Sequence, residues 1–340
     1  MPAQRPAVLS VTLVVALALL AGCATPTGSA GTAPSDPAPS DPATPPAEHF
    51  PLTVHNCGVD VTFNAPPRRV VTVKSSATEM LLALGAGDRI VGTGFLDGPV
   101  PQEWAQQAAD IPALADRVPA AEVVLETQPD LVYAGWESAL TGEGAGDRTM
   151  LADLGVHSYV SPAACREPEH QPDRLTVEHL FAEITEVAAI LGLPDAGEQV
   201  VADQQELLAT IPRDDRGLTA LWYSSGTDIP YVGAGIGAPA LVMDLIGLTN
   251  IAGGVHDTWA SFSWEQVVAD DPDVIVLVDA AWNSAEQKRE LLSSNPATAN
   301  LTAVQNERDL IVPFPASEAG VRTIPAAVDL AEQLAGLSLG

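Results

Sequence analysis

The two halves of the chain contain the same local pattern, in which a short helical stretch is followed by Pro-Asp and a β-branched segment. The first copy is EVVLETQPDLVYAGW, from Glu122 to Trp136, and the second is EQVVADDPDVIVLVDAAW, from Glu265 to Trp282. Proline cannot continue a helix, and Pro-Asp is typical of the turn into a buried strand. A helix–turn–strand unit in each half predicts two α/β lobes.

The segments around both copies alternate between β-branched runs and amphipathic helical patterns. We predict strands at 68–75, 88–95, 130–135, 156–162, 217–224, 273–279 and 309–315. We predict helices at 76–85, 122–127, 148–155, 240–248, 295–305 and 323–337, and another that begins near Glu265. The strands are apolar throughout rather than alternating, which is typical of parallel strands covered on both faces. The pattern therefore indicates the α/β class, with a central parallel sheet in each lobe.

A longer helical pattern separates the two sets. Apolar residues recur at helical spacing across residues 175–211, interrupted only at Gly192 and Pro194. We interpret this segment as a long helical bridge between an N-terminal lobe, residues 50–174, and a C-terminal lobe, residues 212–340.

The residues before the lobes are not expected to belong to the fold. Residues 1–22 contain one arginine and a short apolar run that ends in LAGC, which resembles a bacterial lipobox and predicts cleavage before Cys23 with lipid on that thiol. An ordinary secretory signal is the alternative. Residues 23–49 are rich in Pro, Ala, Ser and Thr, so we expect a lipidated, disordered tether. The globular part would then lie outside the membrane, anchored to its outer face.

Charge and cysteine content narrow the choice of partners. The net charge of −29, from 15 basic and 44 acidic residues, argues against binding to nucleic acid or to anionic lipid headgroups. Apart from Cys23, the chain contains Cys57 and Cys165, which in an oxidising compartment predict one disulfide. A metal site built on these two cysteines is the alternative, but it lacks further ligands at suitable spacing. We expect no metal and no cofactor.

In the order and spacing of its motifs, the chain resembles the substrate-binding lipoproteins of ABC importers for ferric siderophores and cobalamin. The resemblance covers roughly residues 50–335 and rests on the two Pro-Asp units, on residues 65–94 and on GAPALVMDLIGLTNIA at 237–252. It implies two Rossmann-like lobes with a ligand cleft between them. It also implies a monomer that delivers a small molecule to a permease dimer and its ATPase. Residues 222–239 and 315–322 look most like actinobacterial members proposed to bind a phosphorylated deazaflavin precursor of coenzyme F420.

The resemblance gives the repeated glutamates a role that the scaffold does not require. In cobalamin-binding members, one glutamate on each lobe docks to arginines of the permease, and these positions correspond to Glu122 and Glu265. An exposed carboxylate in the first turn of a helix can accept an incoming arginine fork. The alternative is that both are merely solvated residues of a first helical turn.

Candidate ligand residues follow the predicted strands, where parallel sheets open their ligand crevices. They are Phe95, Trp136, Trp222, Tyr223 and Trp259, together with Arg322, which falls where cleft arginines occur in the family. Some of these aromatic residues could instead belong to the core or the rim. The position in the first lobe that corresponds to Trp259 is Asp116, which argues against a simple transfer of cobalamin specificity.

Other classes of protein find less support. A secreted hydrolase would be expected to show a G-x-S-x-G elbow or an H-E-x-x-H helix, and the sequence contains neither. A zinc or manganese importer would place histidine and carboxylate at the strand ends, where this chain has aromatic residues. A sensory or adhesion lipoprotein of the same fold is a further alternative. We expect a binding protein rather than an enzyme.

Overall fold

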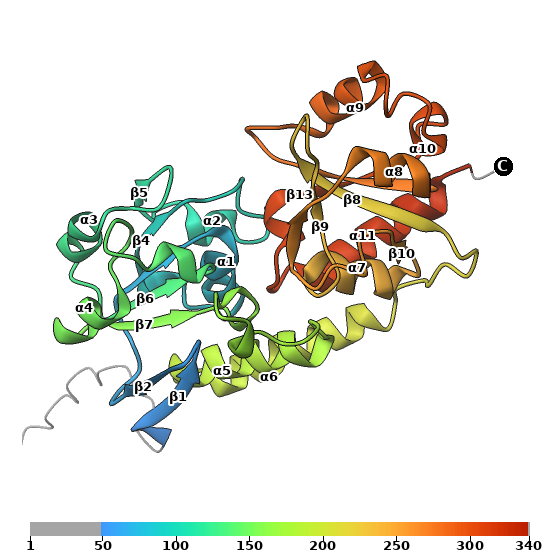
Figure 1. Cartoon of the computed structure of the whole chain (residues 1–340). Helices are drawn as coiled ribbons and strands as arrows, with labels where there is room; N and C mark the ends of the chain where they lie inside the picture. The colour runs from blue at the N-terminus through green and yellow to red at the C-terminus, as the bar shows by residue number, and fades with distance from the viewer. Residues whose placement is uncertain (1–48, 339–340) are drawn as a thin grey trace, which may run out of the picture. The chain divides into compact units, whose positions relative to one another are not determined.

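The first lobe is organised around a parallel sheet of five strands. The computed structural model describes residues 49–338, so the predicted signal peptide, Cys23 and almost all of the tether lie outside the described residues. The sheet has the order β5-β4-β3-β6-β7 and contains β3 (Val70–Val73), β4 (Ile90–Gly94), β5 (Ala113–Ala115), β6 (Leu131–Ala134) and β7 (His157–Val160). Four helices accompany it (Figure 1): α1 (Ser75–Ala83), α2 (Ala105–Ala108), α3 (Ala121–Glu126) and α4 (Arg148–Asp153). Every residue of β3 and β6 is buried, in agreement with the unbroken apolar pattern.

A hairpin that the sequence analysis did not predict precedes this sheet. Strands β1 (Leu52–Asn56) and β2 (Val59–Phe63) are antiparallel, and Phe63 is buried in the core of the first lobe. Cys57 lies in the turn of the hairpin and forms a disulfide with Cys165, with an S–S distance of 1.98 Å.

The second lobe contains a mixed sheet rather than the predicted parallel one. Its strands are β8 (Thr219–Ser225), β9 (Tyr231–Gly233), β10 (Thr249–Asn250), β11 (Trp259–Ser261), β12 (Val274–Asp279) and β13 (Asp309–Pro313). The order is β11-β9-β8-β12-β13, with β10 paired to β8. Strands β8, β12 and β13 are parallel, but β9 runs antiparallel to β8 and to β11. Only residues 226–230 join β8 to β9, which is enough for a hairpin and too short for a parallel crossover.

Five helices surround this second sheet. They are α7 (Ala238–Ile246), α8 (Trp264–Asp270), α9 (Ala285–Ser294), α10 (Thr302–Gln305) and α11 (Thr323–Gly336). None of the helices within residues 49–338 is long and apolar enough to cross a membrane.

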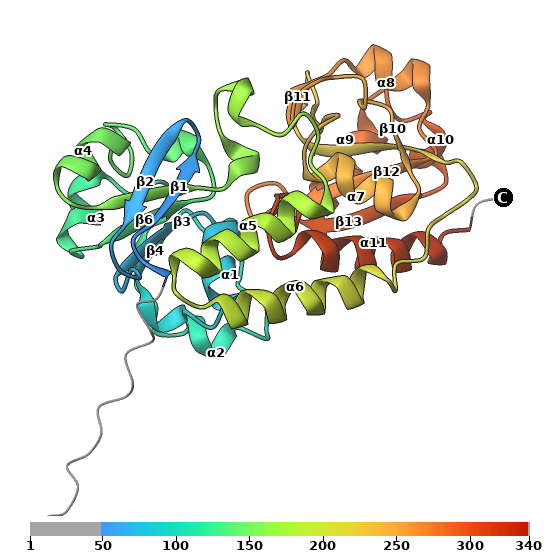
Figure 2. The same cartoon turned by 90° about the horizontal axis from the view of Figure 1, so that it is seen from below.

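The predicted long helical segment forms two helices that pack on each other and are divided at the predicted interruption. Helix α5 (Val177–Ile190) ends shortly before Gly192, whose φ of +66° is left-handed, and α6 (Pro194–Leu208) begins at a proline. Glycine adopts this conformation without a steric penalty, and proline suits the first position of a helix. Figure 2 shows α5 and α6 lying side by side, with α6 reaching from the first lobe to α11 of the second.

The Pro-Asp aspartates have equivalent structural roles in the two lobes. Asp130 accepts hydrogen bonds from the backbone N–H groups of Arg68 and Arg69, at 2.7 and 2.9 Å, just before β3. Asp273 accepts from the backbone N–H and the hydroxyl of Thr219, at 2.8 and 2.9 Å, at the start of β8. Each aspartate therefore fixes the beginning of the strand beside its own. This confirms that the Pro-Asp part of the repeat is scaffold.

Candidate functional site

A buried lysine lies where the strand ends of the two lobes meet. Lys74 directly follows β3 and is 0% exposed. Its Nζ lies 3.6 Å from the ring centroid of Trp136, 4.5 Å from that of Phe95 and 4.9 Å from that of Phe314. Trp136 and Phe95 follow β6 and β4 of the first lobe, whereas Phe314 follows β13 of the second. An ammonium group is attracted to the faces of such rings, so the lysine and the three rings hold the lobes together.

Two carboxylates complete this group, which we call the Lys74 cluster: Lys74, Phe95, Asp97, Trp136, Phe314 and Glu318. Lys74 Nζ donates a hydrogen bond to Asp97 Oδ1 and lies 3.8 Å from Glu318 Oε2. Burial raises the pKa of Asp97, and it raises the pKa of Glu318 to about 8, although Lys74 opposes both shifts. Within residues 49–338, Asp97 Oδ2 and Glu318 Oε1 have no hydrogen-bond partner.

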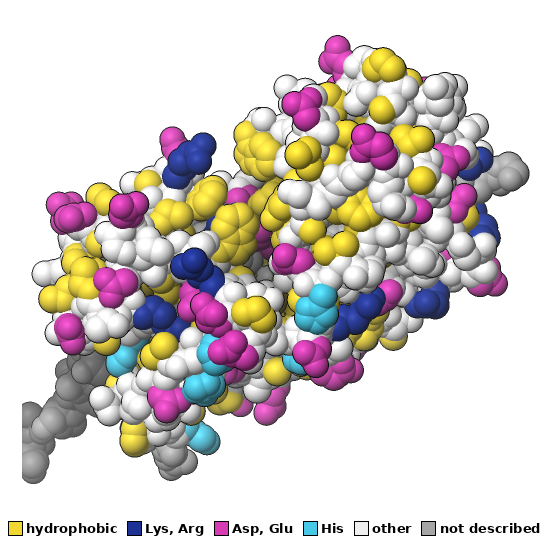
Figure 3. Space-filling view, viewed as in Figure 1, with side chains coloured by type: hydrophobic (Ala, Val, Ile, Leu, Met, Phe, Trp, Pro, Cys, Tyr) yellow, Lys and Arg dark blue, Asp and Glu magenta, His cyan; other side chains and the backbone are white. Residues whose placement is uncertain are grey.

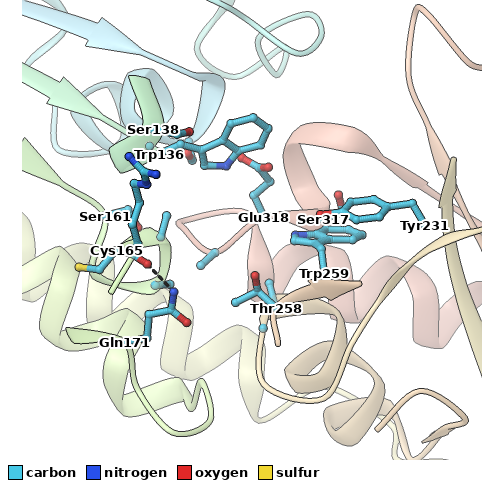
Figure 4. Close-up of a pocket in the computed structure, with 18 residues that line it drawn as sticks. Trp136, Ser138, Ser161, Cys165, Gln171, Tyr231, Thr258, Trp259, Ser317 and Glu318 are labelled. Carbon is cyan, nitrogen blue, oxygen red and sulfur yellow. Dashed lines mark hydrogen bonds between the residues drawn. The ribbon is translucent and has the colours of Figure 1, made fainter. Parts of the chain in front are cut away.

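A cavity of about 260 Å³ adjoins the cluster and is lined by residues of both lobes. Trp136 and Ser161 come from the first lobe, and Tyr231, Trp259 and Glu318 come from the second (Figure 4). The rings of Tyr231 and Trp259 are stacked, with centroids 6.2 Å apart and an interplanar angle of 14°. They lie on the paired strands β9 and β11, so the hairpin that makes the sheet mixed also builds one wall of the cavity.

A second cavity of about 480 Å³ also borders Trp136. Phe95, Asp97, Trp282 and Phe314 line it, and Figure 3 shows hydrophobic side chains around the hollow between the lobes. Both cavities therefore share the Trp136 ring, and both are bordered by a carboxylate of the Lys74 cluster.

Three of the predicted ligand residues line these cavities. Trp136 and Trp259 contact the first cavity, and Trp136 and Phe95 contact the second. Their position agrees with the rule that parallel strands open crevices at their carboxyl ends. Direct contact with a ligand remains a prediction for all three.

The structure does not place the other two predicted strand-end aromatic residues, Trp222 and Tyr223, at either cavity. Both side chains belong to β8 and are 0% and 1% exposed, one on each face of the sheet, and neither lines a described cavity. The Tyr223 ring packs against Trp264 at a centroid distance of 5.3 Å, and its hydroxyl donates to Gly226 O. Because β8 lies in the interior of the sheet and continues into the β9 hairpin, its carboxyl end is covered rather than open.

Arg322 is likewise engaged by the protein rather than directed into either cavity. Its Nη1 donates a 3.2 Å hydrogen bond to Oε1 of Glu79 on α1, and Glu79 is 1% exposed. Burial raises the pKa of Glu79 to about 7, against the opposing effect of the Arg322 charge. The pair spans the two lobes, so Arg322 is a structural contact between them.

The sequence analysis missed Lys74, Glu318 and Tyr231. A usable signal existed for the lysine, because a charged residue directly after an apolar parallel strand stands at the edge where ligands bind. Glu318 lay within the segment that drew attention to Arg322. Tyr231 could not be placed without knowing that β9 pairs with β11.

The two glutamates of the repeated unit are both exposed, as docking would require. Glu122 is in the first turn of α3, and Glu265 is in the first turn of α8. The Ser263 hydroxyl donates a hydrogen bond to Glu265 Oε2 at 2.5 Å and thereby lowers the pKa of Glu265. Contact with a transporter remains a prediction. Within residues 49–338, no three His, Cys, Asp or Glu side chains are grouped so that they could hold a metal.

The chain is similar to known binding proteins along most of its length. A model of the periplasmic binding protein family matches residues 70–313. An uncharacterized ABC transporter substrate-binding lipoprotein, YvrC of Bacillus subtilis, is 24% identical over 332 residues, which cover 95% of each chain. A cobalamin-binding protein of Halobacterium salinarum is 25% identical over 279 residues, covering 76% of this chain and 69% of the relative.

Solved structures show the same fold. A periplasmic binding protein from Veillonella parvula superposes with a TM-score of 0.74 at 26% identity, covering 85% of this chain and 98% of that one. A structure from Saccharomonospora viridis, described as an ABC-type Fe3+-hydroxamate transport system, superposes with a TM-score of 0.72 at 24% identity. The superposition covers 84% of this chain and 99% of that one. The family match spans well over half of the sequence and includes both sheets, so this chain belongs to the periplasmic binding protein family.

Proposed function

We propose that this protein is the extracytoplasmic ligand-binding component of an ABC importer. The observation that carries the proposal is the cavity between the lobes, whose walls contain aromatic side chains from both sheets. Apolar walls with a few convergent polar groups are typical of sites for organic ligands. The names of the Bacillus and Halobacterium relatives support the same role, because one is a transporter lipoprotein and the other binds cobalamin.

The ligand is a large organic molecule such as a ferric siderophore or a corrinoid, with a phosphorylated deazaflavin as the alternative. Trp136, Tyr231 and Trp259 offer flat apolar surfaces on opposite sides of the cavity (Figure 4). The exposed Arg166 lines the same cavity and supplies positive charge locally in a chain of net charge −29. An anionic substituent of the ligand would therefore be placed near Arg166.

Delivery requires an anchor and a docking surface. Lipid on Cys23 would hold the protein to the outer face of the membrane, and residues 24–49 would act as a tether. Glu122 and Glu265 would seat a monomer on the permease dimer that works with its ATPase, because two separated carboxylates define orientation as well as position. The Cys57–Cys165 disulfide suits an oxidising compartment.

The test is native mass spectrometry of the full-length protein purified gently from its own host. We expect an additional mass, with an absorption spectrum that separates a ferric siderophore, a corrinoid and a deazaflavin. The variant Trp259→Ala is purified in the same way for comparison, and we expect it to lose most of the bound molecule. An empty protein, together with normal uptake of all three compounds in a deletion strain, would contradict the proposal.

A further inference from the structure

Glu318 has a position in the cavity wall that the scaffold does not explain. It directly follows the 3-10 helix Phe314–Ser317, and only 6% of the residue is exposed. Its Oε2 lies 3.8 Å from Lys74 Nζ, whereas its Oε1 has no hydrogen-bond partner within residues 49–338. Leaving such an oxygen unpaired in a buried site is unfavourable, so a bound group that satisfies it would gain that interaction.

The charges around Glu318 do not balance if every group is ionised. Lys74 supplies one positive charge, and it donates its hydrogen bond to Asp97. The other groups that act on Glu318 are Asp97, Glu79 and the indole N–H of Trp136, which donates a hydrogen bond to Glu318 but carries no charge. Glu79 is already paired with Arg322. An ionised Glu318 would therefore add a buried negative charge for which no cation is left.

A proton on Glu318 removes this imbalance. Burial raises the pKa of the Glu318 carboxyl to about 8, so it is mostly neutral at about pH 7. With Lys74 positive and Asp97 negative, the cluster then has no net charge. A neutral carboxyl in an apolar wall can donate a hydrogen bond, which an ionised one cannot.

We propose that Glu318 is a specificity-determining residue that donates a hydrogen bond from the cavity wall to a neutral carbonyl oxygen of the ligand. This inference rests on the proposed function and narrows its ligand class to amide- or imide-bearing compounds at this position. The Trp136 ring lies beside Glu318, and Tyr231 and Trp259 face the same space (Figure 4). A ring system held between these side chains would present a carbonyl at its edge to Glu318. A ligand carboxylate at the same place would add a negative charge beside a cluster whose one cation, Lys74, is already paired with Asp97.

Three variants separate donation from other roles of this residue. Glu318→Gln keeps a neutral side chain that can donate, and Glu318→Met has similar length without a donor. Ile229→Ala is a control at an exposed position outside the cavity lining. The probes are riboflavin and cyanocobalamin, which carry neutral imide or amide carbonyls, and haemin, which carries carboxylates.

Affinity is measured by fluorescence quenching between about pH 6 and about pH 10, on either side of the Glu318 pKa. We expect the wild type to bind riboflavin or cyanocobalamin more tightly than haemin, and to lose affinity about tenfold as pH rises through that range. Glu318→Gln should bind at least about tenfold more tightly than Glu318→Met and should lack the pH dependence. The infrared spectrum of the unliganded protein provides a second readout, with a protonated-carboxyl band at neutral pH that Glu318→Gln removes.

Two results would overturn the inference. One is an infrared spectrum in which Glu318→Gln removes no protonated-carboxyl band. The other is a wild type that binds only haemin or none of the probes, since the inferred ligand chemistry would then be incorrect. Neither result bears on the importer role, which uptake assays and mass spectrometry of the natural ligand test separately.

Discussion

Arg322, at the start of α11, donates a 3.2 Å hydrogen bond to Glu79 on α1 and so joins the two lobes through a largely buried ion pair. Replacing Arg322 with methionine leaves Glu79 buried without its partner. We expect the free energy of unfolding to fall by about 1–3 kcal/mol, less than for a fully buried pair because Glu79 can take up a proton. Chemical denaturation measures the change. The double variant Glu79→Met with Arg322→Met should recover most of it, and a double variant as unstable as the single one would contradict this reading.

Buried carboxyls make stability depend on pH. Burial raises the pKa of Glu79 and Glu183 to about 7 and that of Glu318 to about 8. The folded state therefore holds protons that the unfolded state has already released, so this stability is fully present below about pH 4.5 and is lost as pH rises towards 8. We expect the free energy of unfolding to fall by about 3–4 kcal/mol per group between these limits.

Thermal unfolding across this pH range checks the prediction. Glu183 accepts a 2.9 Å hydrogen bond from Tyr133 and is 5% exposed, so Glu183→Gln should flatten the pH dependence. The exposed Glu126→Gln serves as control and should leave the dependence unchanged. A wild-type stability that does not fall between about pH 5 and about pH 8 would contradict the raised pKa values of these carboxyls.

The disulfide closes a long loop in the first lobe. Cys57 and Cys165 are 108 residues apart in sequence, and a loop of that length constrains the unfolded chain by about 4–5 kcal/mol. Replacing both cysteines with serine should lower the unfolding free energy by roughly 2–5 kcal/mol. Denaturation with and without reductant measures it. Reductant should destabilise the wild type and leave the double variant unaffected; an equal response of both proteins would rule out the linkage.

Charge reversal tests the repeated glutamates. We expect Glu122→Arg with Glu265→Arg to abolish uptake and to leave ligand affinity within about twofold, because both residues are exposed and outside the cavities. Glu126→Arg with Asp270→Arg reverses two exposed charges on the same helices and is the matched control. Uptake by cells and titration of the purified protein give the two readouts. Normal uptake by the variant Glu122→Arg with Glu265→Arg would show that these glutamates do not dock the protein to the permease.

Much of the fold could be predicted because the relevant signals are local. The Pro-Asp turns, the apolar strands 70–73 and 131–134 and the helix break at Gly192 follow from the conformational limits of individual residues. The hairpin β1–β2 and the antiparallel strand β9 were missed because they depend on pairing between segments. Three-residue strands such as Tyr231–Gly233 carry too little pattern to be recognised.

The site could be predicted only in part, for a related reason. The rule of strand ends correctly selected Trp136 and Phe95 as cavity residues, since each follows a parallel strand of the first lobe. The strand-end rule did not apply to Trp222, because the β8–β9 hairpin covers the carboxyl end of β8. The pairing of Arg322 with Glu79 joins residues 243 positions apart, and no local pattern indicates which side chain an arginine will meet.

The most direct test of the central claim is the affinity of the natural ligand for proteins altered in the cavity wall. Tyr231→Ala and Trp259→Ala remove stacked rings at the surface of the second lobe, and we expect each to weaken binding by about tenfold or more. Isothermal titration with the ligand identified by mass spectrometry measures this, with Ile229→Ala as the exposed control. The account predicts weaker binding for both ring variants and unchanged binding for the control. Wild-type affinity in both ring variants would contradict it, because the ligand would then bind elsewhere.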